Sequence, residues 1–280
     1  APGPYYFRHA WNLTRRYADA MRAETRRAVE CGTVTWWTNA VLSGTEPADT
    51  ALAHCSGPVL VAGPIDSELQ SGAYNRRAAP RTGSRQSWFD IWRRLRSNGV
   101  ESVRLVLPAP GDPLGLTGSS GLSAIAINAG AAVLAERGDL TLIPGQASTW
   151  RLYPPEGSWN PTASTREPAT PPGGGLGTLS EARRTMREAM IEATRSFGGL
   201  DPDDRALAEI GAARAAKPPI PPAGVDPRAA EVVTSAALVW EVVLIARDAS
   251  SRAGGHRRQL GHLEASARRA LSVAFSHPVG

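Results

Sequence analysis

A chain of 280 residues with 42% apolar and 20% charged residues has a globular composition, which excludes a disordered or fibrous chain. Its net charge of +5 is small for this length, since 31 basic residues oppose 26 acidic ones and Lys217 is the only lysine. The only cysteines, Cys31 and Cys55, are too few for a disulfide framework, so both are expected to be small buried apolar residues.

The first predicted element is an amphipathic helix. Apolar residues recur at helical spacing over residues 5–30, and Gly32 is expected to end the helix. The next stretch, residues 33–42, is β-branched and aromatic, which leaves a strand and the start of a helix both open. No basic start followed by an apolar run is visible, so no signal peptide is evident, although earlier processing could have removed one; we expect a cytoplasmic protein.

A strand, a helix and a second strand follow. Residues 59–62 form a short apolar run between Gly-Pro pairs, residues 84–97 have helical periodicity with Ser84 or Ser87 as the N-cap, and residues 103–107 are apolar again. This order predicts a βαβ unit, in which the two strands would be parallel neighbours.

The next region predicts antiparallel additions to the sheet. Residues 119–128 are compatible with a short helix, and residues 131–135 and 140–143 fit a hairpin. Residues 150–153 are a further candidate strand. The fold class is therefore α/β or α+β, with a mixed sheet that contains one βαβ unit and is flanked by helices.

A region rich in proline and glycine, residues 154–178, divides the chain into a mixed α/β part (1–153) and a helical part (179–280). The helical half either forms its own unit or packs on the first part as one domain. Its predicted helices cover residues 179–197, 203–216, 227–250 and 255–274.

The helix over residues 227–250 is apolar on most of its circumference, so it must be buried on several sides. Its most apolar window, 232–246, is about 15 residues long and contains Glu241, whereas a bilayer span needs ~20. We therefore predict a buried helix and no membrane association. Burial within the C-terminal helices of a monomer is favoured over burial in a homodimer interface.

The best-placed candidate catalytic residues are two aspartates. Asp66 follows the first strand of the predicted βαβ unit and Asp112 follows the second, each after a turn that contains glycine and proline. If the strands are parallel neighbours, both carboxylates lie at the carboxyl edge of the sheet, where open α/β sheets bind ligands. They would then hold Mg²⁺ or form an acid–base pair. The competing interpretation is ordinary turn chemistry, in which aspartate caps nearby backbone N–H groups.

Two further features suggest anion binding. Gly115, Gly118 and Ser119 belong to a glycine-rich connection before a possible helix, although its spacing matches neither a dinucleotide fingerprint nor a P-loop, and turn glycines are the commoner explanation. Arg76, Arg77, Arg81 and Arg85 precede the crossover helix, where guanidinium groups would bind a phosphate or carboxylate. A solvated surface is the alternative.

The sequence does not define an activity. Gly118-Ser119-Ser120-Gly121 is one residue short of the hydrolase motif GxSxG, the five histidines are scattered, and no metal-ligand cluster or cofactor motif is evident. Nucleic-acid binding is not favoured, because no known binding module is present. We carry two hypotheses: a non-catalytic binding or regulatory protein that recognises an anionic small molecule or a protein partner, and an enzyme that uses Asp66 and Asp112 on a phosphorylated or carboxylated metabolite.

Overall fold

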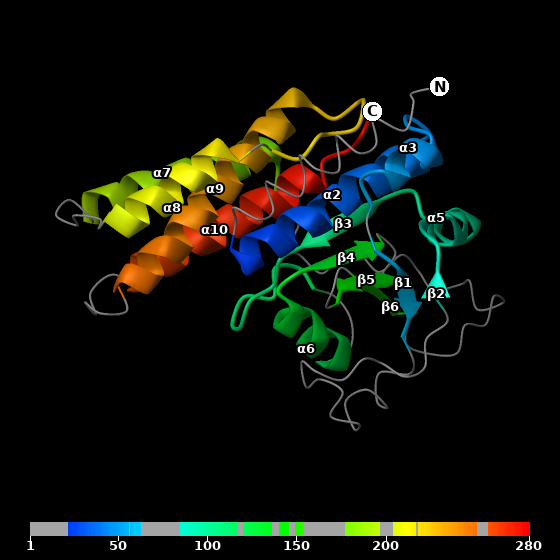
Figure 1. Ribbon diagram of the computed structural model, residues 1–280, viewed down its shortest axis with the longest axis horizontal. Helices are drawn as coiled ribbons and strands as arrows, with labels where there is room; N and C mark the ends of the chain where they lie inside the picture. Colours follow the sequence, from blue (N-terminus) through cyan, green and yellow to red (C-terminus); the bar gives the residue numbers. More distant parts are fainter. Residues whose placement is uncertain are drawn as a thin grey trace.

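The computed structural model describes residues 22–55, 57–62, 85–116, 120–135, 140–145, 149–153, 177–196, 204–216, 218–250 and 257–280. Its helices are α2 (Ala23–Ser43), α3 (Ala48–Leu52), α5 (Trp88–Ser97), α6 (Ser120–Ala129), α7 (Leu179–Ser196), α8 (Asp204–Ala215), α9 (Pro227–Ser250) and α10 (Arg257–Phe275). Its strands are β1 (Val59–Val61), β2 (Arg85–Gln86), β3 (Val103–Val106), β4 (Ala132–Ala135), β5 (Thr141–Pro144) and β6 (Trp150–Tyr153). The mixed sheet, the flanking helices and the helical C-terminal half confirm the predicted fold class (Figure 1).

The six strands form one sheet in the order β2-β1-β6-β5-β4-β3. Strands β3 to β6 are consecutive antiparallel neighbours, so the predicted hairpin between β4 and β5 is confirmed. Strand β1 runs parallel to β6, with Val59 opposite Trp150, and β2 pairs antiparallel with β1 at the edge.

The predicted βαβ unit of β1, α5 and β3 is wrong. Strand β3 is the last strand at the far edge of the sheet and runs antiparallel to β1, with β6, β5 and β4 between them. Helix α5 itself forms as expected, with Ser87 as the N-cap in a capping box with Asp90. Its Trp88 packs edge-on against Trp150 of β6, with ring centroids 5.6 Å apart. Helix α5 therefore packs against β6, a strand that is distant from it in the sequence.

Helix α2 passes through Gly32, so the prediction that this glycine ends a helix is wrong. The helix ends at Gly44, which has the left-handed φ of 78°. Gly32 instead lets Phe275 of α10 lie against the α2 backbone, because a Cβ at this position would overlap the Phe275 ring. The undecided stretch 33–42 is helical, and the part of the predicted helix before residue 22 lies outside the described residues.

Side chains from two helices complete the outer edge of β3. Asn39 of α2 accepts a hydrogen bond from Val103 N at 2.8 Å and donates one to Val103 O at 2.9 Å. Leu105 N donates to Ser276 Oγ, just beyond α10, at 2.9 Å. Arg268 of α10 donates to Leu107 O at 2.7 Å. Side chains from both halves of the chain thus make the hydrogen bonds that a neighbouring strand would otherwise make to these backbone N–H and C=O groups.

The largest apolar cluster contains buried residues from α2, α5, the sheet, α7, α9 and α10. In Figure 1, α2 lies between the sheet and the α7–α10 helices, while α6 covers the opposite face of the sheet. Cys31 and Cys55 are buried and free, as expected. Helix α9 packs against α10, α8, α7 and α2, in agreement with the prediction of a helix buried on several sides.

Helix α9 also has the length and apolar composition of a membrane span over Pro227–Asp248, a longer window than the sequence analysis assigned. Of the most apolar 18-residue stretch within it, 56% is buried inside the protein, and a buried core helix has the same length and composition as a membrane span.

Replacement of Gly32 tests the contact between α2 and α10. Gly32→Ala should lower the free energy of unfolding by about 1–3 kcal/mol, because the new methyl group displaces the buried Phe275 ring. Gly261→Ala in α10 is the control, since a Cβ there meets no atom within 4 Å and alanine favours the helix by up to about 1 kcal/mol. Urea unfolding curves measure both changes, and equal stability of the two variants would contradict the close approach.

Candidate functional site

Asp112 has a structural role in this fold. It closes a turn with Ala109, in which each backbone N–H donates to the other residue's carbonyl at 2.9 Å, and Gly111 supplies the positive φ of 81° that the turn needs. The Asp112 carboxylate accepts a hydrogen bond from buried Arg268 at 2.8 Å. Asp112 therefore lies in a turn, but its carboxylate binds Arg268 and so ties α10 to the segment that follows β3.

The reason for pairing Asp112 with Asp66 is removed by the strand order. Because β1 and β3 are antiparallel, their carboxyl ends point to opposite edges of the sheet. Arg85 lies exposed on β2, at the other end of the strand order from β3. Gly115 has a positive φ of 75°, and its carbonyl accepts a hydrogen bond from Arg104 at 2.8 Å. The other predicted site residues, Asp66, Arg76, Arg77, Arg81, Gly118 and Ser119, lie outside the described residues.

Three titratable side chains in the described part of the chain, two cysteines and one histidine, are packed against other side chains. Burial raises the pKa of the Cys31 and Cys55 thiols, which keeps both protonated and unreactive. The His54 ring stacks on Trp37 with centroids 4.0 Å apart, and burial lowers its pKa. Within the described ranges, no three His, Cys, Asp or Glu side chains gather as a metal site would require.

Glu241 of α9 is a buried acid with a structural role. Both of its carboxylate oxygens accept hydrogen bonds from the backbone N–H of Arg22, at 3.0 and 3.2 Å, and so cap the N-terminus of α2. Burial raises its pKa above the usual range of a glutamic acid. The buried carboxylate thus fixes α9 against α2.

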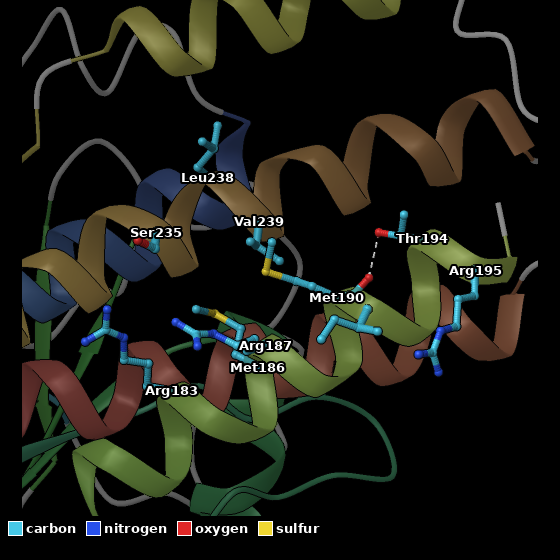
Figure 2. A pocket seen from close by; sticks show the side chains of 10 residues that line it. Arg183, Met186, Arg187, Met190, Thr194, Arg195, Ser235, Leu238 and Val239 are labelled. Carbon is cyan, nitrogen blue, oxygen red and sulfur yellow. Dashed lines mark hydrogen bonds between the residues drawn. The ribbon is translucent and has the colours of Figure 1, made fainter. Parts of the chain in front are cut away.

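A groove with a volume of about 600 Å³ lies between α7 and α9. We call it the α7–α9 groove, and Figure 2 shows the side chains that line it. From α7 they are Arg183, Met186, Arg187, Met190, Ile191, Thr194 and Arg195, and from α9 they are Ser235, Leu238 and Val239. A second hollow of about 350 Å³ shares Arg183, Met186 and Ser235, and continues the groove toward Glu231.

Helix α7 has two different faces. Ala182, Ala189 and Ala193 are buried, and the two later alanines belong to a cluster with Leu260 and Leu263 of α10. The groove residues recur at intervals of three and four along the helix, so they form a second stripe on one side. On that stripe Met190 is 41% exposed and Ile191 is 47% exposed, two of the few large apolar side chains on the described surface. An apolar surface rimmed by charge is typical of a binding site.

The charge at the groove is strongly one-sided. Arg183, Arg187 and Arg195 are exposed on its rim, and no carboxylate in the described ranges lies within ion-pair distance of any of them. The acids Glu188 and Glu192 of α7 lie away from the groove, Glu188 near Arg184 at 3.9 Å and Glu192 near His262 at 4.0 Å. Among the lining residues of both hollows, Glu231 is the one acid.

Sequence reasoning located α7 but missed its exposed stripe. The available signal was the alternation of Arg183, Arg187 and Arg195 with Met186, Met190 and Ile191 at helical spacing. That pattern becomes informative only when the alanine face is known to pack on α10 and Met186 is known to lie in the core, which leaves Met190 and Ile191 exposed beside the arginines.

The fold and groove define a mixed α and β protein whose helical half carries a basic, partly apolar groove. By sequence, residues 31–171 match the N-terminal domain model of the Rv1486c-like protein family, and residues 180–272 match its C-terminal domain model. The chain therefore belongs to the Rv1486c-like protein family. Comparisons with curated proteins and with solved structures find no match.

The structural role of Asp112 is tested by its removal. Asp112→Ala should lower the free energy of unfolding by about 1–2 kcal/mol, since Arg268 loses its carboxylate partner while it remains buried. Exposed Glu101→Ala is the control and should change stability by less than about 0.5 kcal/mol. Thermal unfolding with and without MgCl₂ measures both variants. A stabilisation of the wild type by Mg²⁺ that Asp112→Ala abolishes would restore the metal-site hypothesis.

Proposed function

We propose that this protein is a non-catalytic binding protein that recognises an anionic partner with an apolar surface in the α7–α9 groove. The observation that carries the proposal is the combination of three rim arginines, which have no acidic partner among the described residues, with exposed Met190 and Ile191 on one face of α7. Apolar side chains contribute contact area, while guanidinium groups favour carboxylates, sulfates and phosphates over neutral molecules.

The packing of the surrounding helices supports a preformed groove. Both of its walls pack on α10, and α10 is attached to the sheet through Arg268 and to α2 through Phe275. The groove therefore needs no rearrangement of the core before a partner binds. A rigid site avoids part of the conformational entropy that binding would otherwise cost.

The other described groups favour binding over catalysis. Both cysteines stay protonated in the core, and the Asp112 carboxylate is bound to Arg268. The competing enzyme hypothesis depended on two aspartates at one edge of the sheet, and the strand order no longer supports that placement.

The test uses 1-anilinonaphthalene-8-sulfonate, a small apolar anion whose fluorescence rises when it leaves water. We expect saturable binding to the full chain, with a dissociation constant that increases about fivefold in Arg187→Glu, because the charge reversal places a carboxylate on the rim. Arg184→Glu is the matched control, since it makes the same charge change on the same helix but does not line the groove.

Circular dichroism establishes that both variants keep their helical content before binding is compared. An equal dissociation constant for wild type, Arg187→Glu and Arg184→Glu would place the dye elsewhere on the molecule. That result would overturn the proposed function.

A further inference from the structure

The shape of the α7–α9 groove is that of a trough open to solvent. Its lining residues on α7 run from Arg183 to Arg195, which at 1.5 Å per residue is about 18 Å along the helix axis. Sites for small molecules enclose most of their ligand. A trough between two helices suits instead an occupant that keeps one side in water.

The positions of the arginines restrict the occupant further. Figure 2 shows Arg183 and Arg187 toward one end of the groove and Arg195 at the other, with Met190 between them. A single-headed anion such as a fatty carboxylate carries charge at one end and would leave the other end without a partner. An occupant with acidic groups at both ends and apolar groups between them matches the whole groove.

The apolar centre of the groove suits the irregular apolar side chains of a protein partner. Met186 and Met190 are two of the three methionines in the entire sequence, and both line the groove beside Ile191. Methionine is unbranched and polarisable, so it adapts to irregular partners and is frequent on helix-binding surfaces.

A second copy of this chain is a poor occupant. Pairing the α7 stripes of two molecules would bring Arg183, Arg187 and Arg195 of one copy toward the same residues of the other, without carboxylates to separate them. Like charges in close apposition disfavour such an interface. The charge of the groove therefore favours an acidic partner over a second copy of this chain.

We infer that the α7–α9 groove docks an amphipathic α-helix of a protein partner, with apolar side chains facing Met186, Met190 and Ile191 and acidic side chains facing the arginines at both ends. This inference rests on the proposed function, since it names the class of partner for the same groove. A docked helix of about twelve residues spans the same 18 Å as the α7 stripe. Its apolar anchors at i, i+3, i+4 and i+7 would form one contact face.

The experiment measures fluorescence anisotropy of a labelled 16-residue peptide with leucine at the anchor positions and glutamate near both ends. We expect the full chain to bind it at least tenfold more tightly than a scrambled peptide of the same composition, because scrambling removes the segregated faces. The same peptide with lysine in place of glutamate should bind more weakly than either. Binding of the acidic peptide should weaken as salt rises from about 0.05 to 0.5 M.

Variants locate the two ends of the docked helix. Arg187→Glu and Arg195→Glu should each weaken binding of the acidic peptide about threefold or more, whereas Arg184→Glu should leave it unchanged. Met190→Glu, at the centre, should abolish the preference for the acidic peptide over its scramble.

The outcomes separate this inference from the proposed function. If 1-anilinonaphthalene-8-sulfonate binding depends on Arg187 but the acidic peptide binds no better than its scramble, the helix inference is overturned and the anion site remains. The same holds if decanoate competes with the dye while the peptide does not. If neither the dye nor the peptide responds to Arg187→Glu, both proposals fail.

Discussion

An exposed sheet edge leaves a row of backbone N–H and C=O groups that need hydrogen-bond partners. At β3 those partners are Asn39 from α2, Ser276 after α10 and Arg268 from α10. Because these side chains belong to both halves of the chain, the edge of the sheet fixes α10 relative to α2. The attachment of α10 to β3 therefore also positions α7 and α9, which pack on α10.

The groove forms because α7 and α9 both pack on α10. Buried alanines on α7 allow it to lie close to α10, while α9 fills the space between α10, α8 and α2. The larger side chains of α7, Met190 and Ile191, are then left beside α9 and open to solvent. Exposure of these residues costs hydrophobic stabilisation that burial would supply, which is the usual signature of a surface kept for a partner.

Local patterns predicted the elements well, and long-range contacts explain what they missed. The helical periodicity of residues 227–250 and the N-cap serine of α5 are local features of the sequence, so these two helices were predicted closely. The pairing of Val59 with Trp150 joins segments far apart in sequence, and short strands carry little register information, so the βαβ unit was wrong. Gly32 was predicted to end a helix because its contact with Phe275, which is distant in the sequence, is not visible from local residues. The groove likewise depends on which face of α7 meets α10.

The central claim is that the α7–α9 groove is a binding site, and methyl NMR of methionine-labelled protein tests it most directly. Met186 and Met190 line the groove, and single Met→Leu variants assign their two signals. Titration with the acidic amphipathic peptide should shift both signals along one saturable curve, with a smaller response in Arg187→Glu. Unmoved Met186 and Met190 signals at a peptide concentration that saturates anisotropy would contradict the claim.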